Sequence, residues 1–201
     1  MSSEPIRDPI VDHLLTPQNS VLLVIDYQPT QVNSIKSMDH QTLVDNVVTV
    51  AKTARAYGVP IVHSTVNVKT GANQPTVQPL LDAIGGGNVL DRTQINAWED
   101  VEFRRAVEST GRRKLIMTAL WTEACLAFPT LDALRDGFDV YPVVDAVGGT
   151  SVTAHETALR RVEQAGARLI TIPQLLCELQ RDWARQATVP AFVSLLFKKG
   201  G

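Results

Sequence analysis

Three residues with reactive side chains follow three separate apolar runs of this chain. Asp26 closes the run VLLVID, Arg92 follows NVLD, and Cys125 stands in TALWTEACLAFP, directly after KLIMTAL. A cysteine attacks as its thiolate, and a helix N-terminus or a nearby cation lowers the thiol pKa from about 8.5. A carboxylate can take the thiol proton and pass it to a leaving group. Together the three residues form a possible nucleophilic set.

The chemistry of such a set is acyl transfer. Backbone N–H groups at the start of a helix over 123–136 could hold the oxyanion of a tetrahedral intermediate. The set therefore predicts hydrolysis of an amide or similar acyl compound through a thioester.

Structural explanations compete with this interpretation. A lone cysteine is most often a small core residue, so Cys125 alone decides nothing, and Cys177 in LLCEL is expected in the core. Asn96 fits the cap of a helix over 98–110. Trp98 and Trp121 suit a core as well as a pocket wall.

Alternation of short apolar runs with segments of helical period predicts the fold. We expect strands at 21–26, 61–66, 88–93, 114–120, 139–146 and 168–173, and helices at 39–57, 77–84, 98–110, 123–136, 153–165 and 174–187. Such an order favours a three-layer, doubly wound (Rossmann-like) α/β fold with six parallel strands and helices on both faces. A TIM barrel would need about 250 residues.

The strand order then decides whether the reactive residues meet. Ligands of open α/β sheets bind beyond the carboxyl ends of the strands, near the switch in strand order. If strand 114–120 neighbours strands 21–26 and 88–93, then Asp26, Arg92 and Cys125 converge on one cleft.

Composition limits the remaining classes. The 201 residues are expected to form an N-terminal arm (1–18), one domain (19–187) and a C-terminal segment (188–201) that packs on the domain or on a neighbouring subunit. A net charge of −2 argues against nucleic acid or an anionic membrane as partner. Two cysteines make no disulfide framework, and no apolar run approaches the roughly 20 residues of a spanning helix. A cytoplasmic protein is predicted.

No cofactor motif is present. The four histidines are isolated, which predicts no metal site, and neither G-x-S-x-G, G-x-G-x-x-G nor the P-loop pattern occurs. We expect neither a metal nor another cofactor.

These motifs resemble those of the isochorismatase-like cysteine hydrolases. LLVIDYQ is similar to the family's first strand with its catalytic aspartate, and LIMTALWTEACLAFPTLDAL to the segment around its catalytic cysteine. RTQINAWEDVEF, GFDVYPVVDA and CELQRDW resemble the YcaC subgroup in particular, whose physiological substrate is not settled. The resemblance covers roughly residues 18–185.

The resemblance implies roles for single residues. Cys125 matches the nucleophile, Asp26 the general base, and Arg92 the basic third member, which is lysine in most of the wider family. Arginine keeps its charge and cannot shuttle a proton, so it would orient Asp26 or stabilise the thiolate. Lys69, after the second strand, is the rival cation.

Further features follow from the same resemblance. It implies a non-proline cis peptide at Trp121–Thr122 beside an oxyanion hole, and homo-oligomers, since resembling proteins form ring-like octamers. True isochorismatases lack the cysteine, and HSTVNVKTG lacks the metal ligands of nicotinamidases. The predicted substrate pocket comprises Gln28, Asn33, Asn96 and Trp98.

The expected function is therefore a metal-free cysteine hydrolase of a small amide-type molecule. A non-catalytic oligomeric protein that binds a ligand or senses oxidation through its thiol is one alternative. A thioesterase or acyl transferase with the same triad is another, because acyl substrates differ mainly in the shape of pocket they need.

Overall fold

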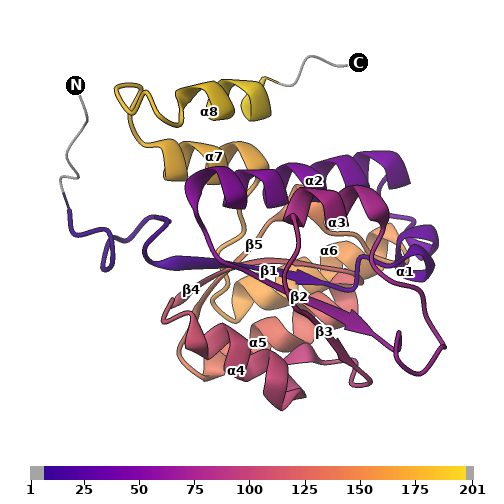
Figure 1. Cartoon of the computed structure of the whole chain (residues 1–201). Helices are drawn as coiled ribbons and strands as arrows, with labels where there is room; N and C mark the ends of the chain where they lie inside the picture. Colours follow the sequence, from indigo (N-terminus) through magenta and orange to yellow (C-terminus); the bar gives the residue numbers. More distant parts are fainter. Residues whose placement is uncertain (1–6, 198–201) are drawn as a thin grey trace.

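A parallel five-stranded sheet lies between two layers of helices in the computed structural model, which describes residues 7–197 (Figure 1). The strands are β1 (Ser20–Ile25), β2 (Ile61–Val66), β3 (Val89–Arg92), β4 (Lys114–Ala119) and β5 (Asp139–Pro142). Their order is β3-β2-β1-β4-β5. The central strands β1 and β4 are buried along their whole length, as continuous apolar runs between two helical layers require.

Eight α-helices accompany the sheet within residues 7–197. They are α1 (Pro29–Ser34), α2 (His40–Tyr57), α3 (Gln78–Ile84), α4 (Val101–Ser109), α5 (Ala127–Arg135), α6 (Val152–Gln164), α7 (Ile172–Gln180) and α8 (Val189–Leu196). Helices α2, α3 and α7 share a core with one face of the sheet, and α4 and α5 share a core with the other. Helix α6 packs beside α5, and α8 lies outside α7 (Figure 1).

Helix α2 shows how the sequence sets these layers. Leu43, Val47 and Val50 recur at helical spacing and are fully buried. The Asp39 side chain accepts a hydrogen bond from a first-turn amide and caps the N-terminus, while Gly58 ends the helix at φ 69°, in the left-handed region.

The sixth strand predicted at 168–173 is not formed. Ile170 makes only an isolated bridge to the residue that follows β5, and helix α7 already begins at Ile172. Thr171 and Gln174 form a reciprocal capping box, which starts the helix before a strand can extend.

The predicted neighbours of β4 are half right. β4 pairs with β1 as expected, but its other neighbour is β5, and β3 is the edge strand beside β2. The strand order therefore switches between β1 and β4, where a parallel sheet opens a crevice at its carboxyl edge.

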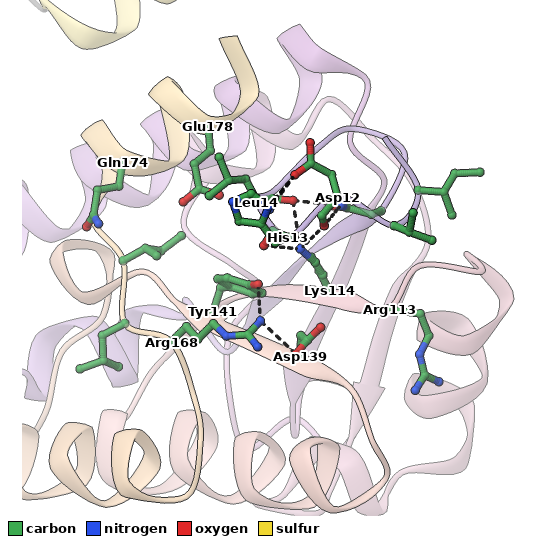
Figure 2. A pocket seen from close by; sticks show the side chains of 15 residues that line it. Asp12, His13, Leu14, Arg113, Lys114, Asp139, Tyr141, Arg168, Gln174 and Glu178 are labelled. Atoms are coloured by element: carbon green, nitrogen blue, oxygen red, sulfur yellow. Dashed lines mark hydrogen bonds and ion pairs between the residues drawn. The ribbon is translucent and has the colours of Figure 1, made fainter. Parts of the chain in front are cut away.

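At the amino ends of the strands, opposite the switch-point side, the N-terminal arm packs against the sheet. Lys114, the first residue of β4, is 6% exposed and donates from Nζ to the carbonyls of Asp12, His13 and Leu14 at 2.7, 2.7 and 3.0 Å (Figure 2). A cavity of about 650 Å³ lies beside these contacts. In Figure 2 the Arg168 guanidinium on its wall is already paired with its neighbours, at 3.0 Å from Asp139.

The C-terminal part of the chain differs from expectation at one cysteine. Leu175, Leu176 and Leu179 bury one face of α7, whereas Cys177 is on the other face and is exposed, so the core assignment of Cys177 was wrong. A helix spanning 174–187 was predicted, but α7 stops at Gln180 and a turn leads to α8. Residues 1–6 of the arm and 198–201 of the C-terminal segment lie outside the described residues.

Within residues 7–197, no helix combines the length and the apolar character needed to cross a membrane.

Candidate active site

Asp26 is the first residue beyond β1 and is fully buried. Its N–H donates to the Ser64 carbonyl at the end of β2 (3.0 Å), and its own carbonyl accepts from the Gln28 N–H (2.9 Å). Its φ is 64°, in the left-handed region, which costs a residue with a Cβ on the order of 1–2 kcal/mol. These backbone hydrogen bonds hold Asp26 just beyond the carboxyl end of β1.

Arg92 ends the edge strand β3 and reaches across the end of β2 to Asp26. Its Nη1 and Nη2 donate to Oδ1 and Oδ2 of Asp26, both at 2.7 Å, in the bidentate arrangement of a strong ion pair. Nη1 also donates to the Ser64 hydroxyl at 3.0 Å and to the Thr65 carbonyl at 3.1 Å. Both side chains of the ion pair are nearly inaccessible to solvent, at 1% and 0% exposed.

Cys125 lies in a short π-helical turn, Thr122–Leu126, between β4 and α5. It is 7% exposed and packs in the apolar core on the α4 and α5 side of the sheet. β1 and β4 pair up to Ile25 and Ala119, so the segments that follow these two strands leave the sheet side by side. The structure therefore brings Asp26, Arg92 and Cys125 together at the switch point.

The electrostatics of the thiol differ from the expectation of a lowered pKa. Burial raises the pKa of Cys125 to about 12, and the charge of Asp26 and its hydrogen bond with the thiol act in the same direction. Arg92 and the backbone amide of Trp121 act against this rise. The guanidinium is already bound to the carboxylate, so the thiol meets an ion pair rather than a free cation.

The ion pair itself is shifted by burial and by its own partners. Burial raises the pKa of the Asp26 carboxyl, while the hydrogen bonds to Arg92 and Cys125 oppose the rise. Burial also disfavours the charged form of Arg92, but the contact with Asp26 outweighs it and the Arg92 pKa lies above its ordinary value. Arg92 stays charged, and Asp26 is a stronger base than a solvated carboxylate.

Two predictions about the cysteine turn require correction. The cis peptide joins Leu120 to Trp121, one residue before the expected Trp121–Thr122 bond, and so lies between the end of β4 at Ala119 and the start of the π-helical turn at Thr122. The Thr122 N–H donates to the Gly148 carbonyl at 2.9 Å, so it is not available to an oxyanion.

Lys69, the rival cation, does not reach the triad. It is exposed in the loop after β2, where its backbone N–H donates to Asp91 at 2.8 Å. The charge of Lys69 lowers the pKa of Asp91, not that of Asp26. The cation beside Asp26 is therefore Arg92.

The four residues predicted to form a pocket fall into different places. Gln28 is buried and bridges two loops, accepting from the Val66 N–H and donating to the carbonyls of Val66 and Gln74. Asn33 is exposed on α1.

Asn96 and Trp98, the other two predicted pocket residues, bind helix α5 and the residue that follows it. Asn96 caps the short 3₁₀ helix at 97–99 and donates to Asp132 at 2.7 Å, and the Trp98 indole N–H donates to Asp136 at 2.8 Å. Their side chains thus fix the elements around the site, and a direct contact with substrate stays a prediction.

Several contacts at the site were not foreseen. The Thr122 hydroxyl lies 2.9 Å from Nδ1 of His155, and Glu123 Oε1 accepts from the N–H of Thr150 at 2.9 Å and from its hydroxyl at 2.5 Å. These contacts join the cysteine turn to the start of α6. The Gly148–Gly149 pair was the available signal, because a buried glycine pair marks a close backbone approach.

No group of three or more His, Cys, Asp or Glu side chains in residues 7–197 is arranged to hold a metal ion.

Known proteins with similar sequences and structures share this arrangement of elements. The family model for the isochorismatase domain matches residues 20–174. The "Probable hydrolase YcaC" of Escherichia coli is 34% identical over 170 residues, 84% of this chain and 81% of that protein. YcaC from Pseudomonas aeruginosa, solved with hexane-2,5-diol and covalent acrylamide, is 31% identical with a TM-score of 0.81 over 94% of this chain and 98% of that one. A crystal structure of the E. coli YcaC gene product, an octameric hydrolase of unknown specificity, is 29% identical with a TM-score of 0.81 over 98% of both chains.

Proposed function

This chain belongs to the isochorismatase family of hydrolases, and we propose that it cleaves a small amide through a thioester on Cys125. One observation carries the proposal: beyond the carboxyl ends of the strands at the switch point, the buried Asp26 carboxylate meets both the Cys125 thiol and the Arg92 guanidinium. A base, a nucleophile and a fixed positive charge are thus in one place.

In the first half-reaction the thiol starts protonated. As the Cys125 sulfur forms its bond to the carbonyl carbon, Asp26 takes the thiol proton, and a tetrahedral intermediate forms. The carbon–nitrogen bond then breaks, and the protonated Asp26 gives the proton to the departing amine. The products of this half are the free amine and a Cys125 thioester.

Water completes the cycle in the second half-reaction. Asp26 takes a proton from a water molecule that attacks the thioester, the carbon–sulfur bond breaks, and the proton returns to the sulfur. Arg92 exchanges no proton because its charge is permanent; it holds both carboxylate oxygens and limits the cost of a buried negative charge. We propose the backbone amides of Trp121 and Cys125 as donors to the oxyanion.

All groups in this scheme are side chains or amides of the chain itself, so we expect turnover to be unaffected by chelators. The covalent acrylamide in P. aeruginosa YcaC supports a reactive site in a similar protein, because acrylamide is an electrophile and also a small amide.

The raised thiol pKa separates the proposal from one alternative. Cysteines that sense oxidation are low-pKa, solvent-accessible thiolates. Cys125 is buried and its pKa lies near 12, which favours a thiol that ionises only as it reacts. A thioesterase would use the same groups, so thioesters belong in any substrate screen.

We also propose a homo-oligomer. The E. coli YcaC structure is octameric, and Trp183, Val193 and Phe197 near the C-terminus of this chain are 62%, 40% and 62% exposed. Exposed aromatic and aliphatic side chains of this kind are typical of a protein interface. Light scattering on the purified protein measures the state directly, and a monomer would contradict this part of the proposal.

A screen with two matched cysteine variants tests the hydrolase. Wild type, Cys125→Ser and Cys177→Ser are incubated with panels of small amides and thioesters, while intact mass reports acyl adducts and chromatography reports products. We expect wild type and Cys177→Ser to turn over the same compounds, and Cys125→Ser to lose activity by about 10³-fold or more. Turnover that survives Cys125→Ser would contradict the thioester mechanism.

A further inference from the structure

The segment that follows β5, with Gly148, Gly149 and Thr150, packs against the π-helical turn that carries Cys125. Gly148 and Gly149 are buried, and a Cβ at Gly149 would lie 2.7 Å from Glu123 Oε2 and 2.9 Å from the Cβ of His155. The Glu123 carboxylate is the end of a flexible side chain, but the Cβ of His155 and its backbone N, at 3.0 Å, belong to helix α6 and cannot swing away. Glycine is therefore required for the turn and α6 to approach this closely.

Four hydrogen bonds join the π-helical turn to the segment after β5 and to helix α6. The Thr122 N–H donates to the Gly148 carbonyl at 2.9 Å, and the Thr122 hydroxyl pairs with His155 Nδ1 at 2.9 Å. Glu123 Oε1 receives the other two, from the amide and the hydroxyl of Thr150. The two residues that open the π-helical turn of Cys125 are thus each fixed to the same segment.

The partners of Thr122 are restricted by burial. Thr122 is fully buried, and His155 is the one side chain bonded to its hydroxyl among the contacts described for residues 7–197. Leaving a buried hydroxyl without its partner is costly, so the pair resists rotation of the Thr122 side chain. Through this bond, helix α6 anchors Thr122 at the start of the π-helical turn, three residues before Cys125.

We infer that His155 is a positioning residue, which holds Thr122 and through it the Cys125 sulfur at the carboxylate of Asp26. The inference rests on the proposed function, because it names what keeps that nucleophile in place. His155 touches neither Cys125 nor Asp26 in any described contact, so it acts through the turn and not on the substrate.

The ionisable groups facing His155 agree with a neutral ring in this role. Burial lowers the pKa of His155, while the charges of Glu123 on the turn and Glu156 on its own helix oppose the shift. In a neutral imidazole, Nδ1 can pair with the Thr122 hydroxyl either as acceptor or as N–H donor, because a hydroxyl can take both roles.

Substitution with a rescuing variant tests the role. His155→Leu removes the bond to Thr122, whereas His155→Asn places Oδ1 near the former Nδ1 and can restore it. Glu156→Gln, on the exposed side of the same helix, is the matched control. Two readouts are taken: the rate of Cys125 alkylation by acrylamide, and hydrogen exchange of the peptide over 120–127.

We expect His155→Leu to slow alkylation about tenfold and to speed exchange in 120–127, while the melting temperature of the domain falls by only a few degrees, as the loss of one buried hydrogen bond implies. His155→Asn should recover the alkylation rate to within about threefold of wild type, and Glu156→Gln should match wild type. In a Thr122→Val background, His155→Leu should have no further effect, since residues that act as a pair are not additive.

Other results would overturn the inference. Unchanged alkylation and exchange in His155→Leu would show that the turn holds without the ring, and equal loss in His155→Asn with a parallel fall in melting temperature would show a merely structural role. If no compound in the amide and thioester panels is turned over by wild type, the proposed function fails by itself. The exchange measurement then still decides whether His155 positions the turn.

Discussion

Two buried cations lie at opposite ends of the parallel strands, one at the amino ends and one at the carboxyl ends, and they differ in what they contact. Lys114 begins β4 at the amino edge, is 6% exposed, and donates to three backbone carbonyls of the N-terminal arm. Arg92 ends β3 at the carboxyl edge, is 4% exposed, and holds both oxygens of a buried carboxylate that also meets a thiol.

The difference shows that partners, not burial, decide what a buried charge does. Burial works against the charged form of both residues, and it lowers the pKa of Lys114, whose amine donates to neutral carbonyls. The pKa of Arg92 is raised because its partner is an anion. Lys114 fastens a segment, whereas Arg92 maintains a reactive group in a place where that group would otherwise be neutral.

The largest effect should follow the loss of Arg92. Arg92→Leu leaves the Asp26 carboxyl without a counter-charge and should lower the free energy of unfolding by about 3–5 kcal/mol. Asp26→Leu in the same chain should recover much of this loss, because no unpaired charge remains. Urea denaturation of the single and double variants measures both, and a double variant less stable than Arg92→Leu would contradict the ion-pair account.

Loss of Lys114 should have a smaller effect, confined to the other edge. Lys114→Met keeps the aliphatic stem but leaves three carbonyls without their donor, which should cost about 1–3 kcal/mol. Limited proteolysis should cut the arm at residues 7–18 faster, while Cys125 alkylation matches wild type. A changed alkylation rate would mean that the contacts of Lys114 influence Cys125, and it would contradict the view that the two cations act independently.

The smallest effect is expected at Ser64, which connects the Arg92 guanidinium to β2. Ser64→Ala removes one acceptor (3.0 Å) from Arg92 but leaves the Asp26 ion pair and the Thr65 carbonyl. We expect a loss of about 1 kcal/mol and a change in alkylation rate of less than about threefold. A loss as large as that of Arg92→Leu would show that the hydroxyl, and not the carboxylate, fixes the guanidinium.

Much of the fold could be predicted because its signals are local. Five of the six predicted strands exist, and the polar residues after β1 and β4 meet as the rule for parallel sheets requires. The sixth strand was overpredicted because RLITIP is apolar enough for a strand, while its Thr171–Gln174 capping box marks a helix start. A regular helix was expected from residue 123, but a π-helical turn at Thr122–Leu126 precedes α5, and the apolar spacing of the segment does not distinguish the two.

The site was less predictable where its geometry depends on distant segments. The thiol pKa was expected to be low because a helix N-terminus and a cation were predicted beside Cys125, but only the structure shows that both terminal guanidinium nitrogens of that cation are bound to Asp26. The contact of Thr122 with His155 spans 33 residues and needs the packed position of α6. Asn96 and Trp98 were predicted to line a substrate pocket, whereas their side chains donate to Asp132 on α5 and to Asp136 just after it.

The titration of the Cys125 thiol, followed by the pH dependence of its alkylation, tests the central claim most directly. Wild type, Asp26→Asn and the control Lys114→Met are compared, with intact mass to confirm that Cys125 is the modified residue. If the carboxylate raises the thiol pKa and serves as its base, the alkylation rate of wild type should keep rising through alkaline pH toward about 12. Asp26→Asn should level off at least about one pH unit lower while losing turnover, and Lys114→Met should follow wild type. An equal midpoint in wild type and Asp26→Asn, or a higher one in the variant, would contradict the shared proton on which the proposed mechanism depends.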